Sequence, residues 1–142
     1  MAIRLYLDTN IILDIADTKR STSEATLKLL ENYMAKGDFL FFINSDTVGT
    51  TYFILRSRSK LSRSEVLETM YRIERMCDIV GATGDDIVRA LDLCRDPSNR
   101  FDDYEDALQF VCAQKVEADH IVTNDRAFVS DGIDIVYPTV SR

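Results

Sequence analysis

Short β-prone runs alternate with longer segments of helical periodicity, and this alternation limits the possible folds more than any other feature of the sequence. The run Phe39–Ile43 is apolar at every position, as expected of a strand buried on both faces of a sheet. Other strands are expected at residues 3–7, 78–80, 120–123 and 133–136. Helices are expected at residues 22–36, 45–58, 62–76, 85–95 and 103–115. This order predicts an α/β fold with a parallel sheet covered by helices on both faces.

Length and composition favour an ordinary globular protein. The 142 residues, without an internal repeat or a Pro/Gly-rich linker, predict a single domain over residues 1–142. No apolar run approaches the ~18 residues of a membrane helix, and the N-terminus lacks the apolar core of a secretory signal. Three widely spaced cysteines fit reduced thiols better than a disulfide framework. We therefore expect a cytoplasmic protein that does not enter a membrane.

The charge balance limits the kinds of partner. A net charge of -7 argues against a protein that holds nucleic acid by a broad basic face. It leaves open an acidic active site that reaches nucleic acid through bound cations. The sequence has a single histidine, His120, and no CxxC pair, which argues against a zinc site.

Acidic residues cluster where the predicted strands end. Asp8 closes the first strand, and Asp125 follows the strand that ends at Thr123. Asp103 and Asp106 lie at i and i+3 in the first turn of a helix and therefore share one face. The carboxyl ends of parallel strands meet at one edge of a sheet, where sites form. A plainer interpretation is also open, in which Asp8 and Asp103 cap the helices that follow them.

Convergence of these acids would require a cation. Two carboxylates ~4 Å apart repel by about 4 kcal/mol at an effective dielectric near 20. Such groups must protonate, separate or bind a cation, and an oxygen-only ligand set favours Mg²⁺ or Mn²⁺. The neighbouring Asp102 and Glu105 fit a solvated helix face.

Three blocks of the sequence together resemble the PIN domain. They are LYLDTNIILDI (residues 5–15), FDDYEDALQF (101–110) and DHIVTNDRAF (119–128). The resemblance implies a three-layer α/β/α sandwich with a central parallel sheet, and Mg²⁺- or Mn²⁺-dependent cleavage of RNA. Many small members are toxins of the VapC type that a partner antitoxin silences, and many form homodimers.

The resemblance also implies roles for individual residues. Carried over by position, the acids of the active site are Asp8, Asp106 and Asp125, with Asp103 as an additional metal ligand. Asn10 and Thr123 match polar residues that orient those acids. By the family's chemistry, Asp8 and Asp106 hold the main cation, while Asp125 holds it through water or binds a second one.

One position departs from the family pattern. Most members carry a glutamate in the helix after the second strand, where this chain has Thr50. Asp46, one helical turn earlier, either substitutes for that glutamate or caps the helix. Loss of one carboxylate should weaken metal binding, so water or the substrate phosphate would complete the ligand shell.

The leading hypothesis is therefore a metal-dependent endoribonuclease, with RNA contacts from the basic stretch Arg56, Arg58 and Lys60, followed by Arg63. One alternative is a catalytically weakened or inactive module that binds RNA or protein. Another is a phosphoryl-transfer enzyme of a different fold, such as a haloacid-dehalogenase-like phosphatase. That class usually needs a second aspartate where this chain has Asn10. Apolar positions around Tyr52–Leu55 and Met70–Ile73 are candidates for a homodimer interface.

Overall fold

The computed structural model describes residues 1–139 and contains a five-stranded parallel sheet in the order β3-β2-β1-β4-β5. The strands are β1 (Ile3–Leu7), β2 (Phe39–Asn44), β3 (Asp78–Val80), β4 (His120–Val122) and β5 (Asp134–Val136). The register pairs Leu5 with Phe41 on one side and with His120 on the other, so β1 lies at the centre of the sheet.

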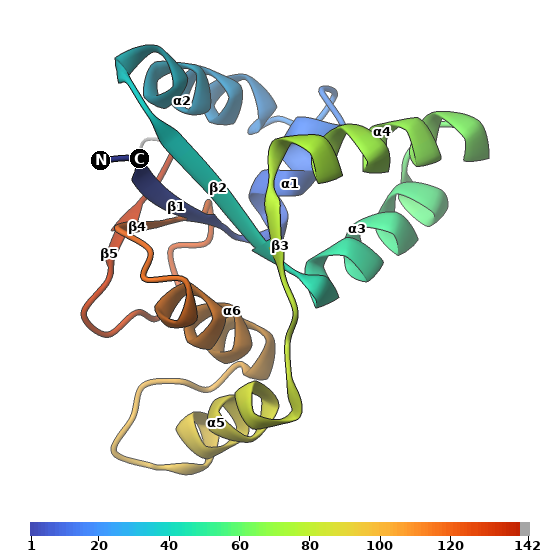
Figure 1. Ribbon diagram of the computed structural model, residues 1–142. Coiled ribbons are helices and arrows are strands. Elements are labelled where there is room, and N and C mark those ends of the chain that lie inside the picture. Colours follow the sequence, from blue (N-terminus) through green and yellow to red (C-terminus); the bar gives the residue numbers. More distant parts are fainter. Residues whose placement is uncertain (140–142) are drawn as a thin grey trace.

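Helices cover both faces of this sheet (Figure 1). They are α1 (Thr9–Ala16), α2 (Ser23–Lys36), α3 (Ser45–Arg58), α4 (Arg63–Met76), α5 (Gly84–Arg95) and α6 (Tyr104–Lys115). The first four helices lie on one side, and α5 and α6 lie on the other (Figure 1). This arrangement confirms the predicted α/β/α sandwich.

Two hydrophobic cores explain why the central strands are apolar throughout. Successive side chains of a strand point to opposite faces. Leu5 and Phe41 therefore pack with α1, α2 and α4, whereas Tyr6 and Phe42 pack against α5 and α6. Because both faces of β1 and β2 are covered, neither strand shows the alternation of a half-exposed one.

Helix α1 is the helix that periodicity did not predict, although the capping interpretation of Asp8 allowed a helix at this place. It has only eight residues, and its apolar residues Ile11–Leu13 are consecutive and all buried, so they show no helical period. Tertiary burial on several sides, rather than an amphipathic stripe, holds this helix in place. The other elements begin and end within about two residues of the expected positions.

The start of α4 is fixed by the capping residues that the sequence suggested. Ser62 Oγ accepts a hydrogen bond from the Glu65 amide at 3.2 Å, and Glu65 Oε1 accepts one from the Ser62 amide at 2.9 Å. This reciprocal pair is the predicted capping box.

The three cysteines Cys77, Cys94 and Cys112 are free, and burial raises the pKa of Cys77 to about 12. Within residues 1–139, no helix has both the length and the apolar character needed to cross a bilayer.

Candidate active site

The candidate site lies where the connections of the sheet diverge. From β1 the chain passes to β2 on one side, and it later crosses to β4 on the other side. In open α/β sheets, a crevice forms beyond the carboxyl ends of strands at such a point. Asp8 follows β1 and Thr123 follows β4, and the Asp8 amide donates to the Val122 carbonyl at 3.0 Å. Strand pairing therefore brings the two residues together across 115 positions of sequence.

Three donors fix the buried carboxylate of Asp8, which is 5% exposed. Its Oδ1 accepts from the Thr9 amide at 2.7 Å, and this contact caps α1. Its Oδ2 accepts from Asn10 Nδ2 at 3.0 Å and from Thr123 Oγ1 at 2.7 Å. Asp8 is thus a helix cap, as one interpretation held, and is also an oriented carboxylate at the crevice.

The hydroxyl of Thr123 connects two acids. Besides donating to Asp8, Thr123 Oγ1 accepts hydrogen bonds from Asn10 Nδ2 at 3.2 Å and from the Asp125 amide at 3.0 Å. Asp125 Oδ1 in turn accepts from the Ala127 amide at 2.9 Å. Thr123 is fully buried, so its rotamer is set by packing as well as by these partners. The structure therefore places Asn10 and Thr123 where they orient Asp8 and the start of the Asp125 loop.

The first turn of α6 brings further acids to the same crevice. Asp103 caps α6, because its Oδ1 accepts from the Asp106 amide at 3.0 Å. Burial, and then the negative charges of Asp8, Asp103, Asp125 and Glu105, raise the pKa of Asp106 to about 7. Such an effect requires these four carboxylates to lie within electrostatic range of Asp106. Glu105 was assigned to a solvated face; it is exposed, yet close enough to raise this pKa.

The pKa of Asp8 is raised as well. Burial is the main cause, and the charges of Asp125 and Glu105 act in the same direction. The hydrogen bonds from Thr123 and Thr9 oppose the shift, because they stabilise the ionised carboxylate. Burial and neighbouring charges therefore disfavour the ionised form of Asp8, while the hydrogen bonds from Thr123 and Thr9 favour it.

The donor set fits a hard divalent cation. The converging groups are carboxylates, whose oxygens suit Mg²⁺ and Mn²⁺. Within residues 1–139, no three Asp, Glu, His or Cys side chains are gathered tightly enough to hold a metal ion unaided. The close three-acid contact considered from the sequence is therefore not formed. Mg²⁺ commonly takes one or two carboxylates and completes its shell with water and phosphate oxygens, which this open arrangement permits.

Helix α3 approaches the site through Thr47 instead of an acid. The N-cap of α3 is Asn44, whose Oδ1 accepts from the Thr47 amide at 2.9 Å, so Asp46 does not cap this helix. Asp46 is exposed and is not among the charges that raise the pKa of Asp8. Thr50 is half-buried, one turn after Thr47.

Gln109 is a buried residue of the site region that the sequence analysis missed. It lies one turn after Asp106 on α6 and is 2% exposed. Its Nε2 donates to Thr9 Oγ1 at 2.9 Å on α1 and to Thr47 Oγ1 at 3.1 Å on α3. The two threonine hydroxyls lie 3.2 Å apart and share a further hydrogen bond. One amide therefore joins the three helices that surround the acids.

The other end of Gln109 is also satisfied. Its Oε1 accepts from the Tyr6 hydroxyl and from Asn44 Nδ2, the latter at 3.3 Å. A glutamine among buried apolar neighbours in α6 was the only sequence signal of this network, because buried polar groups require partners.

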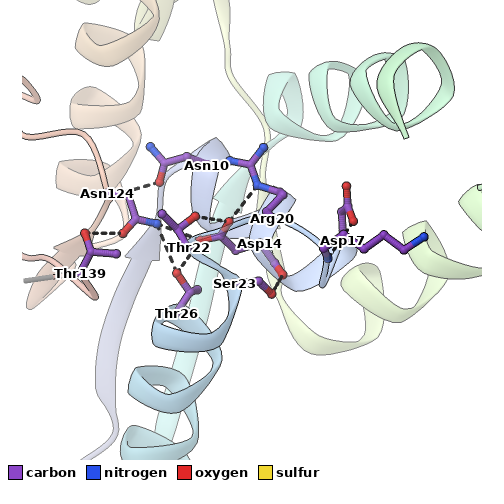
Figure 2. Close-up of polar contacts among 10 residues, drawn as sticks. Asn10, Asp14, Asp17, Arg20, Thr22, Ser23, Thr26, Asn124 and Thr139 are labelled. Atoms are coloured by element: carbon purple, nitrogen blue, oxygen red, sulfur yellow. Dashed lines mark hydrogen bonds and ion pairs between the residues drawn. The ribbon is translucent and has the colours of Figure 1, made fainter. Parts of the chain in front are cut away.

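Asp14 on α1 organises a second buried network (Figure 2). It is fully buried, and its Oδ1 accepts from Arg20 Nε at 2.8 Å and from Thr22 Oγ1 at 2.6 Å. Its Oδ2 accepts from Thr26 Oγ1 at 2.5 Å and from Asn124 Nδ2 at 2.9 Å. Four donors thus compensate the burial of one carboxylate.

Asn124 links this network to the acids. Its backbone N–H donates to Asn10 Oδ1 at 3.0 Å, and its side-chain Oδ1 accepts from Thr139 Oγ1 at 3.3 Å (Figure 2). Asn10 in turn binds Asp8, and Asn124 immediately precedes Asp125. The loop after β4 is therefore held from both sides.

The basic residues expected to contact RNA lie at the end of α3. Arg56, Arg58 and Lys60 are all exposed. Arg58 and Lys60 line a hollow together with Lys19, whereas Arg56 is not among its lining residues.

Comparison with known proteins identifies the family. A family model described as PIN domain matches residues 4–127, which include every acid discussed above. The chain belongs to the PIN domain family. The ribonuclease VapC1 of Aquifex aeolicus (strain VF5) is 27% identical over 133 residues, covering 94% of this chain and 89% of that protein.

Solved PIN-like structures share the fold. VapC20 of Mycobacterium tuberculosis, described as a sarcin-ricin loop cleaving toxin, superposes with a TM-score of 0.64 at 17% identity, covering 82% of this chain and 86% of that one. VapBC2 of Rickettsia felis, solved bound to a promoter DNA fragment, gives a TM-score of 0.68 at 14% identity, covering 95% and 98%. At these identities the likeness concerns the fold of the PIN domain.

Proposed function

We propose that this PIN domain protein is a Mg²⁺- or Mn²⁺-dependent endoribonuclease that acts as the toxin of a toxin–antitoxin pair. The observation that carries the proposal is the oriented, buried carboxylate of Asp8, which lies within electrostatic range of Asp106 and Asp125 at the switch point of the sheet. The similarity to ribonuclease VapC1 supports the reaction, and the VapBC2 likeness is compatible with an antitoxin partner.

In this proposal, Asp8 and Asp106 hold the main cation, Asp125 assists, and Asp103 is an additional ligand that also caps α6. A bound cation would neutralise the substrate phosphate and provide an activated water. Thr123 and Asn10 keep Asp8 Oδ2 in a fixed orientation. Asp106, with a pKa of about 7, must lose its proton before it can act as a ligand.

Cleavage of a labelled single-stranded RNA tests this function. We expect cleavage with Mg²⁺ or Mn²⁺, none with EDTA, and at least a hundredfold loss in Asp8→Asn, as is usual when a group that stabilises transition-state charge is removed. Asp92→Asn, on the exposed side of α5, is the matched control. Cleavage that survives EDTA, or is untouched in Asp8→Asn, would refute the mechanism. RNA binding without turnover at any metal concentration would favour the inactive-module alternative.

We also propose that the protein forms a homodimer through α3 and α4. Phe53 on α3 is 70% exposed and Tyr71 on α4 is 60% exposed, and these are high fractions for large apolar residues on two helices that contact each other. Leu55 and Ile73, which the sequence had suggested for the interface, are 1% and 2% exposed and belong to the cores instead. Light scattering of the wild type and of Phe53→Asp tests this: a dimer should become a monomer.

A further inference from the structure

Four basic side chains from two distant segments line two adjoining hollows beside α1 and α3. One hollow, of about 390 Å³, is lined by Lys19, Arg58 and Lys60. The other, of about 190 Å³, is lined by Arg20 and Arg58. Arg58 lines both, so the two hollows adjoin. We propose that this basic groove, defined by Lys19, Arg20, Arg58 and Lys60, binds the sugar-phosphate backbone of single-stranded RNA.

The proposal rests on the proposed nuclease function and extends it to residues that the sequence did not suggest. Lys19 and Arg20 belong to the connection between α1 and α2, which lies 38 or more positions before Arg58 in the chain. Folding alone brings the two basic segments together. An acidic protein needs such a local cationic surface, because phosphate neutralisation supplies most of the affinity for a nucleic-acid backbone.

The acids of the groove are engaged with backbone groups. Asp17 and Glu65 also line the larger hollow. Asp17 Oδ1 accepts from the Lys19 amide at 3.1 Å, and Glu65 Oε1 accepts from the Ser62 amide in the capping box of α4. The four cations thus face two lining carboxylates, and the buried Asp14 pairs with one of the cations, Arg20, so a positive excess remains.

Arg20 is the anchored member of the groove. Its Nε donates to Asp14 Oδ1 at 2.8 Å, where Asp14 is fully buried and the Arg20 side chain is 34% exposed. Within residues 1–139, its two terminal nitrogens make no hydrogen bond, so they remain available to an incoming anion. A guanidinium can bind a phosphate through two parallel hydrogen bonds. Holding it in place beforehand reduces the entropy lost on binding.

The same buried carboxylate connects the groove to the acids. Asp14 Oδ2 accepts from Asn124 Nδ2 at 2.9 Å, and Asn124 immediately precedes Asp125 (Figure 2). One side chain, Asp14, therefore separates the anchored guanidinium of Arg20 from the loop that carries Asp125.

RNA binding measured without turnover tests the proposal. The full chain in EDTA is titrated against a fluorescein-labelled single-stranded 12-nucleotide RNA by anisotropy, between 50 and 200 mM NaCl. Arg20→Gln, Lys19→Gln, Arg58→Gln and Lys60→Gln are compared with Arg95→Gln, an exposed arginine at the end of α5. Each groove variant should weaken binding and reduce the slope of log K against log [NaCl] by about 0.7, the value for one contact to a single strand. The control should change neither quantity.

Several outcomes would overturn the groove. One is a slope unchanged in Lys19→Gln and Arg58→Gln, whose side chains make no hydrogen bond within residues 1–139 and whose loss should leave the fold intact. A second is undetectable binding of the RNA by the wild type. A third is tighter binding of a duplex DNA of equal length, with the same reduction of the salt slope in the groove variants. If Arg20 served only to neutralise Asp14, Arg20→Gln would lower the melting temperature without changing the slope.

The result separates this inference from the nuclease proposal. Absent cleavage together with reduced slopes would refute the nuclease and support the groove. If the wild type cleaves RNA with a metal ion, and the groove variants keep both the wild-type salt slope and the wild-type cleavage, the groove alone is refuted.

Discussion

Asn124 donates a 2.9 Å hydrogen bond to Asp14 and so joins two residues that are 110 positions apart. The acceptor is a fully buried carboxylate on α1, and the donor belongs to the loop that carries Asp125. This contact couples the folding of the first helix to the geometry of the candidate active site.

Asp14→Asn should therefore destabilise the protein and impair cleavage together. The substitution replaces one accepting oxygen by an NH₂ group. That group must face one pair of the present donors, either Arg20 and Thr22 or Thr26 and Asn124. An unmade buried hydrogen bond costs about 1–3 kcal/mol in the free energy of unfolding. Urea denaturation checks the stability, with Asp92→Asn on α5 as the exposed control. Equal unfolding midpoints for wild type and Asp14→Asn would contradict the role given to this network.

Thr123→Val should weaken divalent-metal binding without unfolding the protein. The substitution keeps the shape of the side chain but removes the hydroxyl that donates to Asp8 Oδ2. Removing such a partner of a metal ligand typically costs 10- to 100-fold in metal affinity. Calorimetric titration with Mn²⁺ measures this. Thr69→Val on α4, whose hydroxyl donates to the Glu65 carbonyl, is a matched buried control that should bind Mn²⁺ as the wild type does.

Asp106 should make the stability of the metal-free protein depend on pH. Its pKa rises from 3.8 to about 7 on folding, chiefly through burial, so the folded state holds this proton more tightly. The resulting stability is fully present below about pH 4 and is lost as pH rises through about 7. In Asp106→Asn, the free energy of unfolding in EDTA should fall less between pH 4 and 8. Mg²⁺ should restore stability to the wild type at pH 8, because the cation binds only the folded protein. Parallel pH profiles for the two proteins would refute this prediction.

Gln109→Leu tests whether the amide holds the helices around the site. The substitution preserves size but leaves the Tyr6 hydroxyl and Asn44 Nδ2 without their acceptor. We expect a loss of about 3 kcal/mol in the free energy of unfolding, since several buried groups lose a partner. Gln114→Leu, exposed on the same helix, should stay within about 0.5 kcal/mol of the wild type. Similar losses in both variants would show that helix α6 itself, rather than the network, is sensitive.

Most of the fold was predictable because local patterns and global packing agree. The apolar run Phe39–Ile43 and the capping box at Ser62 each have one physical explanation, and each is found as expected. Helix α1 escaped detection because its buried residues follow one another directly, so only tertiary contacts distinguish it from a strand. Periodicity reports a single buried face, and α1 has more than one.

The residues of the site that follow strands could be predicted from the sequence, whereas the hydrogen bonds that support them could not. Asp8 and Thr123 follow strands, so topology alone places them at one edge. Gln109 and Asp14 find their partners across as many as 110 positions, and no local pattern contains that information. Asp103 was assignable both to a metal and to a cap; the structure shows the cap, and its metal role stays a prediction.

Thr50→Glu asks whether the departure from the family pattern limits metal binding. The half-buried Thr50 lies on α3, where most PIN domains carry a glutamate. Within residues 1–139, no three carboxylates lie close enough together to hold a metal ion. An added carboxylate should raise Mn²⁺ affinity by roughly tenfold, equivalent to about 1.4 kcal/mol. It should also destabilise the metal-free protein, because another negative charge enters a crevice that already raises the pKa of Asp106. Calorimetry and thermal melting with and without Mn²⁺ measure both effects.

Ser57→Glu, exposed on the same helix, should reproduce neither effect. An unchanged Mn²⁺ affinity in Thr50→Glu would mean that α3 does not present this position to the cation.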